Sequence, residues 1–379
     1  MLDTYDYIIV GSGFYGAVIA ERIASDLNKK VLVLEKNYHI GGNCYSEVHA
    51  ETGIEYHKYG THIFHTSNPR VYNYIKRFCD FNGYYHQVLT TYKDKVFQMP
   101  INLETINGFF NLNLKPFEVE SFLKQKIEEA AIGEPKNFEE AALNSIGKEL
   151  YDAFIKGYTQ KQWGRDPKEL PASIIKRLPV RKNYNESYFF DTWQGIPTND
   201  YTDIFTKMLN HKNVKVQLNT DFFDVRNEIS DDAKIVYSGP IDKYFDYCFG
   251  RLEWRSLRFE QEVENVDDYQ GTSVMNYAEA EIPFTRIHEP KHLHVDREVF
   301  TLPKSLLIKE YSLTNNDDPY YPISDEANKT ILTKYQDKAA KFKNLIVGGR
   351  LGDYKYYDMH HTIEKALDTF NQKIRNGKN

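Results

Sequence analysis

The sequence predicts an α/β protein whose parallel β-sheet is assembled from separate parts of the chain. A strand, glycine turn, helix and second strand open the chain, and a similar strand, glycine turn and helix lie near its end. Between them, one stretch has helical periodicity, and another has short β-branched and aromatic runs separated by turn residues. We therefore expect two insertions, a helical subdomain and an antiparallel β-sheet subdomain.

The pattern of the opening residues justifies the first unit. Residues 7–10 form a continuous apolar run, as in a parallel strand that is covered on both faces. The turn Gly11-x-Gly13-x-x-Gly16 follows, and residues 17–27 then carry apolar side chains at helical spacing. Further elements of this domain are expected at 31–34, 214–218, 234–237 and 344–347, with a late helix at 361–370.

The two insertions differ in composition. Residues 117–157 are rich in Glu, Lys, Ala and Leu at 3.6-residue spacing, whereas 252–313 carry the short runs typical of strands. We divide the chain into a dinucleotide-binding domain in three parts (1–85, 206–250 and 326–379), a mainly helical substrate and loop domain (86–180), a linker with part of the sheet domain (181–205), and the sheet domain (251–325).

Composition and charge exclude several classes of protein. The 379 residues are 41% hydrophobic and 27% charged, which describes a globular protein and not a disordered chain. The net charge of −6 argues against a nucleic-acid binder, and no apolar run approaches a membrane span. The start has no basic region of a secretory signal, and Cys44, Cys79 and Cys248 form no disulfide or zinc pattern. We expect a cytoplasmic protein without membrane insertion, nucleic acid or metal.

The glycine turn and the acidic residue after it predict a dinucleotide site. The first glycine permits the tight turn, the second lets the backbone approach a pyrophosphate, and the third lets the helix pack on the strand. Glu35 closes the second strand, 19 residues after Gly16, where its carboxylate can accept both ribose hydroxyls. Because this charge would repel a 2′-phosphate, FAD or NAD is favoured over NADP.

Two later segments favour FAD, and hence an FAD-binding Rossmann-type domain. Residues 36–43 continue into a Gly-Gly loop, where bare backbone can pass close to a diphosphate and a flavin. The turn Gly348-Gly349-Arg350 and a helix start near Met359-His360 offer a second amide-rich terminus for the flavin ring. In the loop 59–65, His62 and His65 suit a segment pressed against a planar cofactor, although a structural turn with surface histidines is an alternative. We expect no metal on these histidines, because no carboxylate or cysteine cluster is visible nearby.

A basic and aromatic segment indicates a second ligand. Between Arg165 and Lys182 there are six basic and two acidic residues, with Trp163 just before them. Aromatic rings beside guanidinium groups match a nucleoside attached to a diphosphate, whereas a solvated basic face is the alternative. Arg286 and the tyrosines of 320–321 and 354–357 repeat the theme. We find no Ser-His-Asp arrangement, no P-loop, no recognisable acid/base pair and no second glycine motif for NAD(P)H.

Together these segments resemble the bacterial UDP-galactopyranose mutases. The resemblance runs from the first strand to the last helix in family order, through residues 11–16, 39–43, 60–65, 157–164, 176–181, 283–286, 319–322 and 349–359. It implies a flavoenzyme that interconverts UDP-galactopyranose and UDP-galactofuranose without net redox change and so supplies UDP-galactofuranose for cell-surface polysaccharide. It also implies that the FAD is reduced, and that its N5 attacks the anomeric carbon and displaces UDP.

The resemblance also implies roles for individual residues. Arg177, Arg286 and His62 are the catalytic candidates, and the two arginines would neutralise the leaving diphosphate. The implied substrate contacts are His86, Phe154, Tyr158, Thr159, Tyr188, Asn276, Tyr320 and Tyr356, with Trp163 on a mobile loop that closes over the substrate. The implied FAD contacts are Gly11, Gly13, Phe14, Gly16, Glu35, Lys36, Asn43, His62, Ile63, Asp221, Phe222, Arg350, Asp358, Met359 and His360.

Some expectations depart from the family pattern or stay open. Thr61 stands where many members have Pro or Ala, and His86 stands where some have Asn. The resemblance implies a homodimer and an external reductant such as NAD(P)H, and leaves open whether UDP-N-acetylgalactosamine is also a substrate. The alternatives are a flavin-dependent oxidoreductase of the amine-oxidase type and a fold-related, non-catalytic binding protein.

Overall fold

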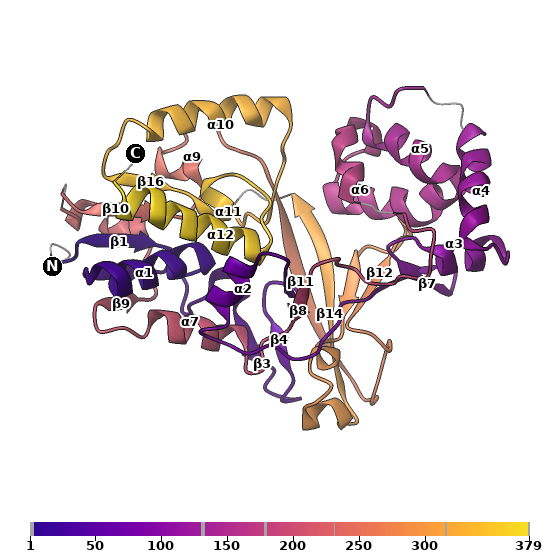
Figure 1. Ribbon diagram of the computed structural model, residues 1–379, viewed down its shortest axis with the longest axis horizontal. Coiled ribbons are helices and arrows are strands. Elements are labelled where there is room, and N and C mark those ends of the chain that lie inside the picture. The colour runs from indigo at the N-terminus through magenta and orange to yellow at the C-terminus, as the bar shows by residue number, and fades with distance from the viewer. Residues whose placement is uncertain (1–3, 130–132, 178–179, 231, 315–316, 378–379) are drawn as a thin grey trace.

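The computed structural model describes residues 4–129, 133–177, 180–230, 232–314 and 317–377, apart from the side chains of Ser173, Lys176 and Arg177. A five-stranded sheet, parallel throughout, lies at the end of the molecule that carries both termini (Figure 1). Across the sheet the strands are β16 (Leu345–Val347), β10 (Lys234–Tyr237), β1 (Tyr7–Val10), β2 (Val31–Leu34) and β9 (Val214–Gln217). The predicted discontinuous Rossmann-type sheet is therefore confirmed.

Alternation along β1 explains why this sheet is covered on both faces. Tyr7 and Ile9 point into one apolar core and Ile8 into another, and all three are buried. The first core is shared with α1 (Phe14–Leu27), α2 (Pro69–Ile75), α7 (Tyr201–Leu209), α12 (Met359–Thr369) and the π-helical turn Phe370–Arg375. The second is shared with α8 (Phe222–Val225), α9 (Ile241–Tyr244), α10 (Glu326–Ala339) and α11 (Gly349–Gly352).

A seven-stranded sheet stands beside this domain. Its order is β15 (Tyr321–Pro322), β11 (Trp254–Glu264), β14 (Ser305–Thr314), β13 (Arg286–His288), β12 (Val274–Tyr277), β6 (Val88–Tyr92) and β7 (Lys95–Met99). Neighbours are antiparallel, as predicted, except that β12 and β6 run parallel. Strands β6 and β7 come from the stretch 86–180, which our division gives to the helical domain. They form a hairpin closed by Lys93 and Asp94, both at positive φ.

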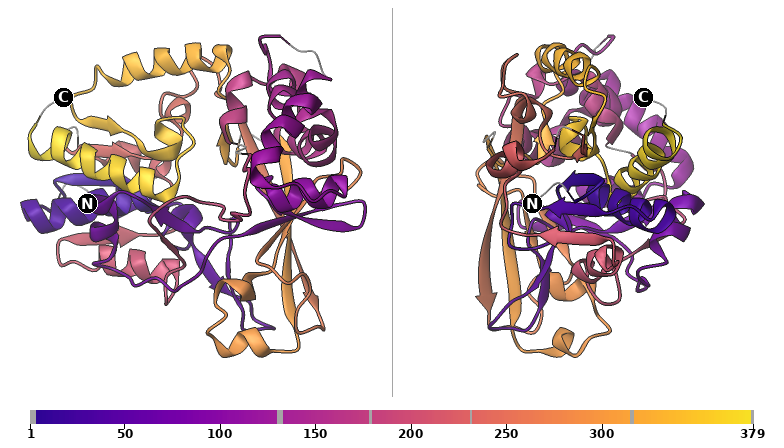
Figure 2. Two further views of the ribbon diagram at one scale, coloured as in Figure 1. Left: turned by 45° about the vertical axis from the view of Figure 1, so that its right-hand side comes forward. Right: turned by 90° about the vertical axis from the view of Figure 1, so that its left-hand side faces the viewer.

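The inserted helices form a lobe on the other side of this sheet from the parallel sheet (Figures 1 and 2). They are α3 (Leu103–Phe110), α4 (Pro116–Glu128), α5 (Phe138–Leu150), the π-helical turn Tyr151–Lys156 and α6 (Gly157–Trp163). Asn102 and Asn137 cap the first turns of α3 and α5 with their side chains. Phe97 of β7 joins the core of the lobe, so the hairpin connects the lobe to the sheet.

Short elements complete the chain. Two small antiparallel pairs join β3 (Ser46–Val48) to β4 (Glu55–His57) and β5 (Phe64–Thr66) to β8 (Trp193–Gly195). The 3₁₀ turns are Gly42–Cys44, Pro167–Glu169, Ala172–Arg177, Arg226–Glu228, Pro290–Leu293 and Glu298–Thr301. Within the described ranges, no helix has both the length and the apolar composition of a membrane span.

Candidate active site

A cavity of about 910 Å³ lies where the parallel sheet, the seven-stranded sheet and the helical lobe meet. Its wall begins at the carboxyl ends of β1 and β2 and reaches β13 and the π-helical turn of the lobe. A cavity at the carboxyl ends of parallel strands is where open α/β sheets bind nucleotides. Among its lining residues are most of the predicted ones: Gly11, Gly13, Phe14, Glu35, Lys36, Asn43, His62, Ile63, His86, Phe154, Tyr158, Tyr188, Asp221, Phe222, Asn276, Arg286, Tyr320, Arg350, Tyr356, Asp358 and Met359.

The glycine turn has the close contacts that its spacing predicts. A Cβ on Gly16 would lie 2.0 Å from the carbonyl oxygen of Gly11, so only glycine lets α1 pack against the end of β1. Gly11 has φ +96°, a conformation that favours glycine. Gly13 faces the Gly41-Gly42 loop, where the nearest atom to a Cβ would be 3.8 Å away. No acidic residue stands in the first turn of α1, which leaves its amides free to face a phosphate.

Glu35 holds the glycine turn to the end of β2. Its carboxylate, which is buried, accepts hydrogen bonds from the Ser12 amide (3.0 Å), the Ser12 hydroxyl (2.7 Å) and the Asn37 amide (2.9 Å). A carboxylate has about four acceptor positions, so one remains for a ligand. To accept hydrogen bonds from both ribose hydroxyls, as predicted, Glu35 would have to use one acceptor position for both hydroxyls. Otherwise it would have to release one of its three hydrogen bonds to the protein.

Arg350 also lines the cavity, from α11, which packs against the start of α1. Its guanidinium donates to the carbonyl oxygens of Pro319 (3.3 Å) and Tyr320. No described carboxylate lies within ion-pair distance of Arg350, and burial lowers the pKa of its guanidinium. A cation with little local compensation favours an anionic ligand such as a diphosphate or an electron-rich flavin.

His62 faces the cavity as a neutral ring. Its Nδ1 lies 2.6 Å from the Gly60 carbonyl, which can only accept, so Nδ1 carries the hydrogen and Nε2 is left as an acceptor. Burial, with a smaller contribution from Arg350, lowers the pKa of His62 to about 4. The His57 ring accepts the His62 amide (2.9 Å) and fixes the loop. The predicted catalytic histidine is therefore suited to accept a hydrogen bond near pH 7.

Arg286 belongs to a charged network that the sequence analysis did not predict. Its Nε lies 3.3 Å from Glu310 Oε1 on β14, and its Nη2 donates to the Tyr158 hydroxyl. His288 contacts the other oxygen of Glu310 (3.0 Å) and Thr61 (2.7 Å).

The two charges of this network support each other. Burial opposes both, but Arg286 and the His288 contact lower the pKa of Glu310 to about 2, and Glu310 with Tyr158 raises the pKa of Arg286. The guanidinium is therefore held in a fixed position beside an ionised carboxylate. Glu310 lies 24 residues from Arg286 in sequence and meets it only through the pairing of β13 and β14.

Asn276 and His86 line the substrate end of the cavity. Asn276 Oδ1 is buried and accepts no hydrogen bond. His86 Nδ1 lies 2.9 Å from the Tyr84 hydroxyl, the ring stacks on Phe189, and burial lowers the pKa of His86 to about 3. Because a buried polar atom is costly when unpaired, Asn276 marks a place for a ligand donor.

Four predicted residues lie away from the cavity wall. Gly16 is behind the glycine turn, and Thr159 is buried on α6. Trp163 is the last residue of α6, because Gly164 at positive φ ends the helix. Its side chain packs against the core of the helical lobe and does not lie on an open loop. His360 faces His65 beside the wall. The Arg177 side chain is outside the described residues, so its predicted contact stays a prediction.

Most of the basic segment is engaged with the protein itself. Arg165 pairs with Glu253 (2.9 Å) and Asp325 (3.4 Å), and Lys182 pairs with Glu120 (2.7 Å). Arg181 donates to a backbone carbonyl and lies under the Phe190 ring. Lys168 lies 3.8 Å from Glu139. Of the basic side chains in this segment, those of Lys176 and Arg177 lie outside the described residues, so the predicted match to a diphosphate stays a prediction.

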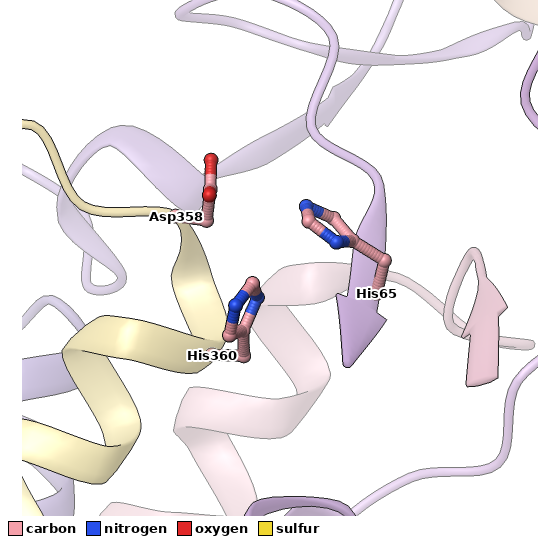
Figure 3. A group of neighbouring side chains, drawn as sticks. All are labelled: His65, Asp358 and His360. Atoms are coloured by element: carbon pink, nitrogen blue, oxygen red, sulfur yellow. The ribbon is translucent and has the colours of Figure 1, made fainter. Parts of the chain in front are cut away.

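His65, Asp358 and His360 form a group beside the cavity (Figure 3). One ligand atom from each lies within 4.8 Å of the others, a separation that could hold a metal ion after small movements. His65 Nδ1 also lies within hydrogen-bond distance of Asp191 Oδ2 (2.7 Å). The expected lack of a carboxylate near His65 is thus wrong, because the start of α12 and the strand β5 meet here. The absence of a metal stays a prediction.

The comparisons with known proteins agree with this geometry. A sequence model of NAD(P)-binding Rossmann-like domains matches residues 9–78, and a model of UDP-galactopyranose mutases matches residues 153–356, more than half of the chain. The chain is 43% identical to a "Probable UDP-galactopyranose mutase" of Klebsiella pneumoniae, over 97% of this chain and 94% of that protein. This chain belongs to the UDP-galactopyranose mutase family. The resemblance found in the sequence is confirmed.

Two further matches bear on this mutase family member. It is 40% identical to a "dTDP-fucopyranose mutase" of Escherichia coli, over 98% of this chain and 99% of that protein. The crystal structure of a reduced UDP-galactopyranose mutase covers 97% of this chain and 96% of its own, with a TM-score of 0.76 at 14% identity, and so shows the fold alone. Membership of a family of flavin-dependent isomerases disfavours the amine-oxidase and binding-protein alternatives.

Proposed function

We propose that the protein interconverts UDP-galactopyranose and UDP-galactofuranose, with FAD in its reduced form and no net redox change. One observation carries the proposal: a single cavity joins the glycine turn of a dinucleotide site to Arg286 and the aromatic residues of a second ligand site. A cofactor and a nucleotide sugar can therefore meet inside it. The 43% identity to the Klebsiella pneumoniae protein supports the substrate.

The cofactor end fits FAD. The diphosphate would lie against the bare backbone of the glycine turn and the amides of α1, and the ribose near Glu35. Arg350 would supply positive charge to the flavin or its phosphates, and His62 would offer its Nε2 as an acceptor. The reduced flavin, when bound, would supply the nucleophile for the anomeric carbon.

The other end fits the nucleotide part of the substrate. Arg286, held by Glu310, would stabilise the diphosphate as it leaves the sugar and carries more charge, with Arg177 as its predicted partner. Tyr188, Tyr320 and Tyr356 would donate hydroxyl hydrogens to the same charge. Phe154 and Tyr158 would face the base, and Asn276 would accept from it.

A second substrate is favoured by a specific observation. The Escherichia coli relative named a dTDP-fucopyranose mutase is 40% identical over nearly the whole chain. Compared with UDP-galactopyranose, dTDP-fucopyranose carries an additional methyl group on its base. It lacks the ribose 2′-hydroxyl and the 6-hydroxyl of the sugar. Each of these differences is small for a binding pocket, so the shared fold does not decide between the two nucleotide sugars.

Chromatography of the products tests both candidates. Holoenzyme reduced with dithionite is incubated separately with UDP-galactopyranose, dTDP-fucopyranose and UDP-N-acetylgalactosamine, and oxidised holoenzyme is the control. We expect the furanose form from UDP-galactopyranose only with reduced enzyme. Furanose product from dTDP-fucopyranose alone would transfer the assignment to the second candidate. Oxygen or NAD(P)H consumed in proportion to product would overturn both.

The same proposal includes the setting of the enzyme. We propose a cytoplasmic homodimer that makes UDP-galactofuranose for cell-surface polysaccharide and receives electrons from an external donor such as NAD(P)H. Family membership supports these points. Light scattering of the purified holoenzyme gives the number of subunits, and flavin bleaching under anaerobic NADH or NADPH identifies the donor.

A further inference from the structure

Lys161 lies just before the basic and aromatic segment, yet its charge does not face the cavity. Its ammonium donates to four backbone carbonyl oxygens, those of Tyr277 (2.7 Å), Glu279 (2.8 Å), Ile282 (3.0 Å) and Phe284 (3.0 Å). An ammonium has three hydrogens, so four acceptors saturate it. No described carboxylate lies within ion-pair distance of its Nζ, and Lys161 is not among the residues that line the cavity.

All four carbonyls belong to one short piece of chain. Tyr277 ends β12, and the other three lie in the connection 278–285 that leads to β13. This connection therefore wraps around a single ammonium on α6. Burial lowers the pKa of Lys161 to about 8, against a smaller opposite effect of Glu279 and Glu281, so the group is charged at neutral pH.

The same connection touches α6 at a second point, one helical turn earlier. A Cβ on Gly157 would lie 2.5 Å from the Ala278 carbonyl oxygen and 2.9 Å from the Ala280 amide nitrogen. Residues 157 and 161 are four apart and so lie on one face of the helix. Helix and connection therefore meet backbone against backbone at one end, and through the caged ammonium at the other.

The carboxyl end of α6 is tied to the sheet as well. Arg255 of β11 donates to the carbonyls of Gln162 (3.0 Å) and Lys161 (3.2 Å), and the Ser312 hydroxyl of β14 donates to Gln162 (2.8 Å). These donors satisfy carbonyls that the end of a helix leaves unpaired. The helix α6, at the edge of the helical lobe, is thereby fixed to the seven-stranded sheet (Figure 1).

Three residues that line the cavity adjoin this attachment. Tyr158, next to Gly157, contacts Arg286, the first residue of β13. Asn276 lies on β12, just before the connection. We propose that Lys161 is a positioning residue: its ammonium holds α6 and the β12–β13 connection together and so sets the geometry in which Tyr158, Asn276 and Arg286 bind the nucleotide. This inference rests on the proposed function.

Lys291 provides a matched control. Its ammonium also donates to backbone carbonyls only, those of Asp267 (2.8 Å), Leu302 (3.0 Å) and Lys304 (2.9 Å), and the residue is buried. It lies in the turn Pro290–Leu293 and does not line the cavity. Lys161→Met and Lys291→Met therefore each remove an ammonium that is surrounded by backbone carbonyls. Lys161 lies beside the nucleotide end of the cavity, and Lys291 lies away from it.

The test measures UDP binding to flavin-loaded protein by titration, together with KM, kcat and the thermal midpoint. Both variants should unfold at lower temperature. Only Lys161→Met should weaken UDP binding and raise KM, by about tenfold or more, because a small misplacement of binding groups has large effects. Its flavin absorbance spectrum should be that of the wild type, since Lys161 does not line the cavity.

Equal UDP affinity in Lys161→Met, Lys291→Met and wild type would overturn the proposal, and so would an equal loss in both variants. If Lys161→Met does not fold, Lys161→Arg takes its place. A planar guanidinium keeps the charge but does not fit carbonyls arranged around a compact ammonium, so the same weakening is expected. Titration with UDP needs no turnover, so its result is independent of whether the mutase activity is found.

Discussion

Arg286 shows how one residue can be both fixed and available for a ligand. Glu310 lies beside its Nε and Tyr158 beside its Nη2, so the planar group has little freedom to turn. A guanidinium has five hydrogens, and these two contacts leave others for a diphosphate. Fixed donors stabilise developing charge better than mobile ones, because they need no reorganisation during the reaction.

Removing this group should reduce catalysis strongly. Arg286→Ala should lower kcat by about 10²- to 10³-fold, as for loss of a single donor that stabilises charge in a transition state. Arg258→Ala is the control, since Arg258 lies on β11 and pairs with the exposed Glu260. Steady-state kinetics with UDP-galactopyranose distinguish the two. A near-normal kcat of Arg286→Ala would show that Arg286 does not stabilise the leaving diphosphate.

Glu310 should make stability depend on acid. Its pKa in the folded protein is about 2, below the usual value of 4.5, so the ionised carboxylate stabilises the fold above pH 4.5 and this stabilisation is lost as pH falls toward 2. Glu310→Gln cannot ionise. The thermal midpoint of the wild type should therefore exceed that of Glu310→Gln near neutral pH, and the gap should narrow from about pH 5 to about pH 3. A difference in thermal midpoint that stays constant over this pH range would contradict the lowered pKa of Glu310.

At the scale of elements, the turn between β1 and α1 is the most constrained. It has to bring the start of α1 close to the end of β1 and still leave bare backbone for a phosphate. Glu35, at the end of β2, holds the same turn through Ser12. Two neighbouring strands thus shape one anion site, and a change at the turn affects both packing and cofactor binding.

Gly16→Ala should therefore lose flavin. The added methyl group would lie 2.0 Å from the Gly11 carbonyl oxygen, a contact that only a shift of α1 can relieve. Gly83→Ala is the control, because Gly83 is exposed and a Cβ there meets nothing within 4 Å. The absorbance of purified protein near the flavin maximum, relative to that at 280 nm, gives the occupancy. Equal occupancy in both variants would mean that the turn is not the cofactor site.

At the scale of the whole molecule, the cavity depends on four parts of the chain that are distant in sequence. The glycine turn comes from the start of the chain, Tyr158 from the helical lobe, Arg286 from the seven-stranded sheet and Arg350 from near the end. The described lining of this cavity comes from the parallel-sheet domain and from both insertions. Placing the lobe and the sheet on the carboxyl side of the parallel strands brings a second ligand to the cofactor.

The parts of this arrangement that rest on local spacing could be predicted from sequence. The glycine turn and Glu35 are separated by one strand and one helix, so the pattern alone locates them. The partnership of Arg286 with Glu310 depends on the register of β13 on β14, and no local pattern encodes that register. Lys161 shows a different limit: a lysine next to aromatic residues looks the same whether it faces a phosphate or backbone carbonyls.

The central claim is that the protein rearranges a nucleotide sugar without consuming electrons. The most direct test reduces the holoenzyme once, removes the excess reductant, and counts the UDP-galactose molecules interconverted per flavin under anaerobic conditions. The account predicts many molecules per flavin, with the flavin still reduced at the end. At most one molecule per flavin, accompanied by flavin oxidation, would contradict it.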